Sequence, residues 1–387
     1  MFISPLKIYF SFWIFPLAII QILDFELFVK PSVDLYVLVV GSTLLFFFMT
    51  ILFQFLIKAK SSPSFTLSNN INYPVFFKAT IGLFLLWSFV YIVNVVGSGG
   101  LPIYWIIVSD GRTYVDFGLP TLGGLSNLLR AFTLTCFFII YKFGPKRSKK
   151  ISLYISIFLL VTAFIFETGR GNGVVLLLHP VAIYFLTRKF TIGQLALLFL
   201  VFIAFLVFTG SIQVLRYENG IDMLFSYLKS QGIDIGDNLP LALFMPSVLY
   251  IVLPIVNTGL NLEYATFFDL NPYYSMQGLV PTIIRDFLFV EKDYGVLVNA
   301  ANNVTSYFTP LVRDFGLYGG LMFSSLLLSY TSYVYRKART GCLLNILLLP
   351  PVFMSVTLSF FSLFYTSLVV VLYPILALFT YNLIKIR

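Results

Sequence analysis

The sequence predicts an all-α polytopic membrane protein with about ten transmembrane helices and one large external loop. The chain has 387 residues, of which 59% are hydrophobic and only 11% are charged, whereas soluble domains average about 25% charged residues. Residues 35–57 and 192–215 contain no Asp, Glu, Lys or Arg. These runs lack the alternation of barrel strands, so helices are the expected spanning structure. We expect residues 1–387 to form a single membrane domain.

Ten apolar stretches match the length that a helix needs to cross the hydrocarbon core. They are residues 8–23, 35–57, 75–97, 122–141, 151–166, 173–187, 192–215, 316–335, 343–359 and 364–384. The last two are distinguished by the length of the uncharged stretch that contains both. The 45 uncharged residues between Arg339 and Lys385 would extend over about twice the bilayer core as one helix. We therefore expect the chain to turn near Ser359–Ser362.

Two further apolar stretches are predicted to be interfacial or re-entrant. Residues 101–108 are too short to cross a bilayer. Residues 239–256 are long enough, but three prolines interrupt them, and each proline removes a backbone donor. A single crossing here would also move the basic residues Arg336–Arg339 to the other side of the membrane.

The distribution of charge predicts the orientation. The net charge is +9, but the basic residues lie in short links between apolar stretches, which argues against nucleic-acid binding. With the N-terminus inside, 16 of the 25 basic residues and none of the 16 acidic residues fall inside, as the positive-inside rule requires for the basic ones. Both termini are then cytoplasmic. The external loops are residues 98–121 and residues 216–315. The larger loop is too long for a plain connection and too rich in aromatic residues for disorder.

Arginines on the outside are unexpected under this rule and are candidate ligand contacts. They are Arg112, Arg130, Arg170, Arg216, Arg285 and Arg313. The guanidinium group stays charged and binds phosphate oxygens bidentately. A lipid-linked pyrophosphate is an obvious anion at the outer face, and fixed cations stabilise the charge that gathers on it as it leaves. The alternative is that each arginine snorkels or pairs with a nearby acid, such as Glu167 with Arg170.

Two local features stand out within the predicted helices. In the Phe166–Gly173 segment, three glycines bracket Arg170 at an external turn, and the helix that follows would present free N–H groups to an anion. A plain tight turn is the alternative. His179, the only histidine, precedes Pro180. It could act as an acid or base, or it could be a buried, hydrogen-bonded residue. No partner cluster suggests a metal.

A polar segment leads into the eighth predicted span. It contains Asn302, Asn303, Tyr307, Arg313 and Asp314. A carboxylate at the outer membrane surface could accept a proton from a sugar hydroxyl. Equally, an aspartate at a helix start suits the helix dipole.

This segment resembles a known family. The stretch from Asn302 through Tyr307 to Arg313-Asp314-Phe315-Gly316-Leu317-Tyr318-Gly319 is similar to the pattern before a late span in bacterial oligosaccharide repeat-unit polymerases, the O-antigen or Wzy-type polymerases. The Thr168-Gly169-Arg170-Gly171 turn is similar to their small-Arg-Gly turn. Some members carry a glycine eleven residues after the loop arginines, and this chain does not.

The resemblance implies a GT-C-like membrane glycosyltransferase in the bacterial inner membrane. Donor and acceptor would be undecaprenyl-pyrophosphate-linked oligosaccharides, with no cofactor and no metal. The implied catalytic residues are Asp314, Arg313 and Arg170. The expected substrate contacts are Arg216, Arg285, Arg112, Asn302, Asn303, Tyr307 and His179. Tyr264, Tyr273, Tyr274 and Tyr307 would offer stacking faces to sugar rings. Membrane lipid and a chain-length regulator are the other expected partners.

Three other functions fit the same composition. An O-antigen ligase would transfer finished glycan, and the Asp-Phe-Gly stretch favours the polymerase over it. A transporter or flippase would carry charged residues deep in its spans, where this sequence has almost none. A structural scaffold would leave the external arginines unexplained.

Overall fold

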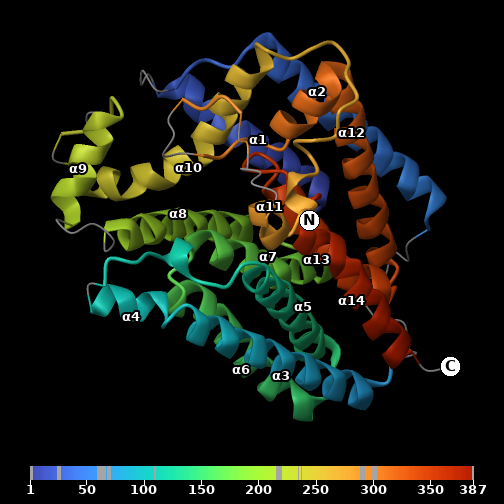
Figure 1. Cartoon of the computed structure of the whole chain (residues 1–387). Coiled ribbons are helices and arrows are strands. Elements are labelled where there is room, and N and C mark those ends of the chain that lie inside the picture. Colours follow the sequence, from blue (N-terminus) through green and yellow to red (C-terminus); the bar gives the residue numbers. More distant parts are fainter. Residues whose placement is uncertain are drawn as a thin grey trace.

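The structure is a computed structural model of the whole chain (Figure 1). It describes residues 3–23, 28–58, 67, 71–108, 110–214, 220–233, 235–236, 238–287, 293, 295–298 and 303–385, and none of these forms a strand. The helices are α1 Pro5–Ile22, α2 Val33–Leu56, α3 Tyr73–Gly97, α4 Pro102–Ile107, η1 Tyr114–Asp116, α5 Leu122–Phe143, α6 Lys146–Val161, η2 Thr162–Phe166, α7 Arg170–Thr187, α8 Ile192–Val214, α9 Gly220–Ser230, α10 Leu239–Leu262, η3 Gln277–Leu279, α11 Thr282–Phe287, α12 Phe308–Arg339, α13 Leu343–Thr357 and α14 Leu368–Ile384.

A helix occupies each of the ten ranges that the sequence predicts to cross the membrane. Seven described helices are long and apolar enough to cross one, and α7, α8, α13 and α14 are shorter apolar helices. The polytopic all-helical class is therefore confirmed, while the number of crossings stays a prediction. The predicted turn near Ser359–Ser362 is also confirmed, because α13 ends at Thr357 and α14 begins at Leu368.

Helix α10 contains the stretch 239–256, which was predicted to be interfacial or re-entrant. Its three prolines do not interrupt it, because the stretch lies in one continuous helix of 24 residues that is among the seven long ones. Its placement relative to the membrane stays a prediction. Pro240 lies in the first turn, where no intrahelical N–H is needed. Further along, the Pro254 carbonyl accepts hydrogen bonds from Thr258 Oγ1 at 2.6 Å and Ser306 N at 3.2 Å. The second of these bonds ties the middle of α10 to the segment before α12. Figure 1 shows α10 running from α9 toward α1 and α2.

One end of the bundle gathers the helix ends that carry the basic residues. Arg336 Nε donates to Ile57 O at 2.8 Å, Arg339 Nη1 donates to Leu186 O at 2.8 Å, and Asn72 N donates to Ile384 O at 3.1 Å. These bonds join the C-terminal ends of α2, α7, α12 and α14 to the start of α3. We call this the basic end. The opposite end, at the starts of α5, α7 and α12, is the loop end.

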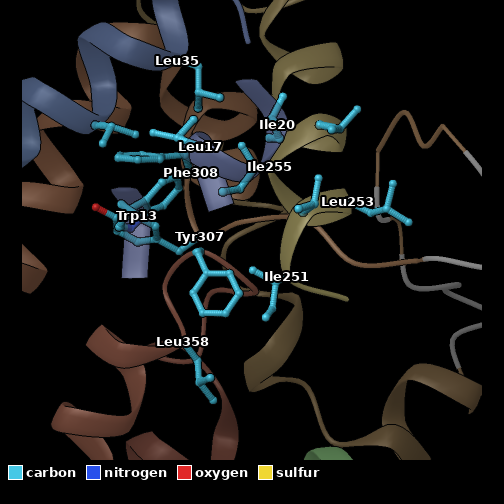
Figure 2. Close-up of a cluster of buried hydrophobic side chains, with 14 of the residues drawn as sticks. Trp13, Leu17, Ile20, Leu35, Ile251, Leu253, Ile255, Tyr307, Phe308 and Leu358 are labelled. Atoms are coloured by element: carbon cyan, nitrogen blue, oxygen red, sulfur yellow. The ribbon is translucent and has the colours of Figure 1, made fainter. Parts of the chain in front are cut away.

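A large apolar core holds the N-terminal helices against α10. Figure 2 shows side chains from α1, including Trp13 and Leu17, packed between Leu35 of α2 and Ile255 of α10. Tyr307 and Phe308, which precede the long part of α12, lie in the same cluster, and so does Leu358 after α13. Hydrogen bonds also fix this region. Trp13 Nε1 donates to Ser359 Oγ at 3.0 Å, and the hydroxyls of Tyr9 and Tyr307 lie 2.8 Å apart.

Helix α12 bends sharply at Gly316. This residue has φ 70° and ψ −179°, a backbone conformation that is essentially restricted to glycine. Past the bend, Gly320 lies against the backbone of Val312, and the rings of Phe315 and Phe323 stack with centroids 3.9 Å apart. The residues before the bend therefore fold back against those after it. The predicted span 316–335 begins at this bend, and the segment before it packs into the bundle.

Candidate functional site at the loop end

The bend in α12 is the platform on which the large loop is fixed. Residues 266–275 of the loop run beside residues 314–318, with Asp269 N donating to Phe315 O at 3.0 Å and Leu317 N donating to Thr266 O at 2.9 Å. A side chain at Gly316 would overlap the loop, since a Cβ there would lie 2.6 Å from the Cα of Phe268. The Asp-Phe-Gly stretch therefore holds the loop in place.

Asp314 is the centre of this attachment. Its side chain is fully buried, and its two carboxylate oxygens accept from Tyr274 N at 2.7 Å and Ser275 N at 2.6 Å. Hydrogen bonds to a carboxylate are the strong kind. The sequence left two roles open for Asp314, a proton acceptor and a helix-start residue. The contacts give it a third role, in which it orients the loop that carries Tyr274.

Arg313, the neighbouring residue, is held from two sides. Its guanidinium donates to Asp293 through Nη1 and Nη2, both at 3.0 Å, and its Cζ lies 3.6 Å from the centroid of the Tyr274 ring. A carboxylate in its plane and an aromatic ring on its face give the guanidinium one orientation. Arginine has five N–H donors, and within the part of the chain that the structure describes two of them are bonded, both to Asp293.

Asp293 and its surroundings are not among the site residues that the sequence predicted. Asp293 Oδ1 also accepts from Gly295 N at 2.7 Å, and Asp293 N donates to Gln277 Oε1 at 3.2 Å. The Arg313 guanidinium holds the pKa of the Asp293 carboxyl below its usual value, so the carboxylate is ionised at neutral pH. No local motif announces this pair, because the loop brings together residues 20 positions apart.

Two buried polar atoms on residues that adjoin this pair have no hydrogen-bond partner among the described residues. They are Ser275 Oγ and Gln277 Nε2. Both side chains are buried, at 2% and 6% exposure, and unsatisfied polar atoms in such positions cost free energy. The described part of the loop therefore holds hydrogen-bonding capacity, on residues that adjoin Tyr274 and Asp293, that its own described contacts do not use.

A second charged pair joins the first half of α5 to the turn before α7. Arg130 Nη1 and Nη2 donate to the two carboxylate oxygens of Glu167 at 2.6 and 3.0 Å, and Nη2 also donates to Asn127 Oδ1 at 2.5 Å. Both side chains are almost fully buried. One alternative for Arg170 was a pair with Glu167, but Glu167 pairs with Arg130 of α5.

The glycine turn is shorter than predicted. Helix α7 begins at Arg170, so the turn is confined to residues 167–169, and Gly173 lies inside the helix against the Phe164 ring. Thr168 has a positive φ of 49°. The backbone of Arg170 is therefore at the first helical position, next to the buried Glu167, while its side chain lies outside the described residues.

The remaining predicted site residues are dispersed. Arg112 is exposed and pairs with Asp110 through Nη2 at 2.7 Å, with its Cζ 4.3 Å from the Trp105 ring. Arg285 lies in the short helix α11 and is half-buried, and Asn303 is exposed. Arg216 and Asn302 lie outside the described residues. Arg112, Arg130 and Arg313 thus each pair with a different carboxylate, and no contact among the described residues joins them around one group.

Two predicted contacts are buried in the bundle instead. Tyr307 has no exposed surface and bonds to the Tyr9 hydroxyl, so it presents no stacking face to a sugar. His179 is 2% exposed, and its Nδ1 donates to Val175 O at 2.9 Å. It is therefore the buried, hydrogen-bonded residue of the second alternative. Of the loop aromatics, Tyr264 and Tyr273 are exposed, while the Tyr274 ring is covered on one face by Arg313.

Comparison with protein-family models, curated proteins and solved structures finds no match to this chain. The candidate site therefore rests on the geometry alone. It consists of Arg313, Asp293, Tyr274, Ser275 and Gln277, positioned by Asp314, and we call it the Arg313 site. Its donors suit an oxyanion, and its exposed aromatic neighbours suit sugar rings.

Proposed function

We propose that the chain is a membrane glycosyltransferase that joins undecaprenyl-pyrophosphate-linked oligosaccharide units into a surface polysaccharide at the outer face of the bacterial inner membrane. The observation that carries this proposal is the fixed orientation of Arg313 between Asp293 and Tyr274, with two of its five N–H donors on Asp293. Such a group is suited to hold a pyrophosphate, and the charge predicts that the loop end faces outward.

In the proposed reaction, a hydroxyl of one lipid-linked unit attacks the anomeric carbon of the other. The new glycosidic C–O bond forms as the bond to the lipid pyrophosphate breaks, and the leaving pyrophosphate takes the electron pair. Arg313 stabilises that charge, because a preorganised cation needs no rearrangement as the charge develops. Asp293, ionised and 42% exposed, accepts the hydroxyl proton, while Asp314 positions the loop.

The placement of buried charge supports an enzyme over a transporter. Among the described residues, the buried Asp, Glu, Lys and Arg side chains are Arg130, Glu167 and Asp314, and all three lie in the part of the bundle nearer the loop end. An ion-coupled transporter places such groups along a pathway through its spans. A ligase would use the same chemistry on a different acceptor, so the experiment has to separate it.

Complementation of a gene deletion tests the proposal. The deletion strain would carry the wild-type gene, Arg313→Ala, or Lys229→Ala as a control that removes an exposed cation of α9, with expression checked by immunoblot. We expect deletion to leave single repeat units, the wild type and the control to restore a ladder on a polysaccharide gel, and Arg313→Ala to lose it. Long polymer left on the lipid carrier would identify a ligase. An unchanged ladder in the deletion strain would overturn the proposal.

A further inference from the structure

The basic end carries a cluster of cations built around one tyrosine. Lys142, in the last turn of α5, places its Nζ 4.7 Å from the centroid of the Tyr184 ring. Arg188, just after α7, places its Cζ 5.5 Å from the same ring and donates through Nη1 to the Tyr184 hydroxyl. The cluster therefore joins two separate connections of the chain, α5–α6 and α7–α8, at a single aromatic side chain.

Lys149 brings a third positive charge to the same place. Its Nζ donates to the carbonyl oxygen of Lys142 at 3.4 Å, and Lys142 lies within electrostatic range of both Lys149 and Arg188. Like charges held this close repel one another. The tyrosine face and the backbone carbonyl offset part of that repulsion, but neither carries a negative charge.

The chain offers no carboxylate to this cluster from the neighbouring segments. The sequence has no Asp or Glu between residues 117 and 166, between residues 168 and 217, or after Asp314. The ion pairs of the described residues all involve Arg112, Arg130 or Arg313, at the other end of the bundle. The natural counter-ion of the cluster therefore comes from outside the chain.

An apolar strip adjoins the cluster and indicates what kind of anion fits. Helix α6 starts beside Lys149 and exposes Ile151, Tyr154, Ile157 and Phe158, each 44–58% accessible. A ligand with a phosphate at the cations and hydrocarbon along α6 would satisfy both surfaces. Basic pockets at the cytoplasmic ends of transmembrane helices bind anionic headgroups in this way, and tyrosine is enriched at that depth.

We propose that Lys142, Lys149 and Arg188, arranged around Tyr184, bind the phosphate headgroup of an anionic membrane lipid whose acyl chains lie along α6. This site is independent of the Arg313 site and of the reaction proposed there. Its occupant neutralises a cluster that the fold assembles without an acid, so the bound lipid stabilises the packing of α5 against α7.

Binding of phosphatidylglycerol to the purified full-length protein tests the site. Native mass spectrometry in detergent would compare phosphatidylglycerol with phosphatidylcholine. We expect selective retention of phosphatidylglycerol by the wild type. The triple variant Lys142→Gln/Lys149→Gln/Arg188→Gln should bind it about a hundredfold more weakly, at roughly fivefold per cation. If the triple variant does not fold, Arg188→Gln alone should still show the single-cation loss.

A matched control separates a built site from a diffuse positive field. The variant Lys78→Gln/Lys146→Gln/Arg147→Gln removes the same charge from exposed side chains and should retain phosphatidylglycerol binding within a fewfold. Equal losses in both triple variants would overturn the proposal in favour of diffuse attraction. Displacement of the lipid by millimolar inorganic phosphate, or equal retention of phosphatidylcholine, would overturn the lipid assignment.

Discussion

The two ends of the bundle use positive charge in different ways. At the loop end, Arg112, Arg130 and Arg313 each hold a carboxylate. At the basic end, Arg336 and Arg339 bond to backbone carbonyls, and the remaining described contacts of the cations are largely to tyrosines. A carboxylate fixes the direction of a guanidinium, whereas a carbonyl or ring leaves most of its charge unbalanced. The loop end thus fixes the orientation of its guanidinium groups, whereas the basic end leaves positive charge available to the anionic lipid proposed above.

The buried pair at the loop end should give the largest effect when broken. Arg130→Met leaves Glu167 as an uncompensated charge in a nearly dry site, because the two side chains are only 2% and 6% exposed. Loss of one partner of a buried pair costs about 3–5 kcal/mol. We expect a matching loss in the free energy of unfolding, measured by denaturant titration in mixed micelles.

The double variant sharpens this prediction. Arg130→Met/Glu167→Leu removes both charges, and replacing a buried pair by apolar residues is often neutral. The double variant should therefore recover most of the stability that the single variant loses. If the double variant is instead destabilised by the sum of the losses in Arg130→Met and Glu167→Leu, the two side chains do not stabilise one another.

Gly316→Ala should come next in size. The backbone at φ 70° and ψ −179° costs about 1–3 kcal/mol for a residue with a side chain, and the new Cβ would overlap Phe268. We expect the large loop to detach and become sensitive to limited proteolysis between residues 263 and 287. Gly259→Ala is the control, since a Cβ there meets nothing within 4 Å. Equal protease resistance in both variants would show that the bend does not hold the loop.

The same bend shows how far the sequence could predict this molecule. Apolar runs and basic links predicted a helix in all ten ranges. Bilayer thickness sets the length of an apolar run and membrane orientation sets where basic residues lie, and both are visible in the sequence. The Asp-Phe-Gly stretch was also correctly singled out. Its contacts were not predictable, since Asp314 and Gly316 hold a loop some 40 positions earlier in the chain.

Pairings across the chain account for the other differences. Glu167 bonds to Arg130, 37 positions away, although Arg170 is only three residues along the sequence. Asp293 looked like one of many loop acids until the fold placed it against Arg313. The bond from Ser306 N to Pro254 O, which ties α10 to the segment before α12, was likewise not visible in the sequence. Local sequence patterns predict the helices, whereas the hydrogen-bond and ion-pair partners of polar side chains depend on tertiary contacts.

Asp314→Asn should have an intermediate effect that isolates the attachment from the bend. The asparagine keeps one oxygen and replaces the other with an amide nitrogen, so one of the two N–H groups at Tyr274 and Ser275 loses its acceptor. A hydrogen bond to a charged group is worth about 1.5–3 kcal/mol. We expect a loss of that order in the free energy of unfolding. Complete retention of stability would remove Asp314 from its positioning role.

The Arg313–Asp293 pair should give the smallest effect, because the Asp293 side chain is 42% exposed and solvent screens such pairs to about 1 kcal/mol or less. The direction in which this contribution to stability changes with pH is nevertheless defined. Hydrogen bonding to Arg313 lowers the pKa of Asp293, so the pair stabilises the fold fully above the ordinary pKa of about 3.9. This contribution is lost as the pH falls through the lower folded-state pKa.

Melting temperatures between pH 6 and pH 3 should therefore fall slightly more for the wild type than for Asp293→Asn. Asp222→Asn, on the exposed side of α9, should follow the wild type. A wild type that instead gained stability over Asp293→Asn on acidification would mean that Asp293 is not held by Arg313 in solution, and the loop end would then lose its distinction from the basic end.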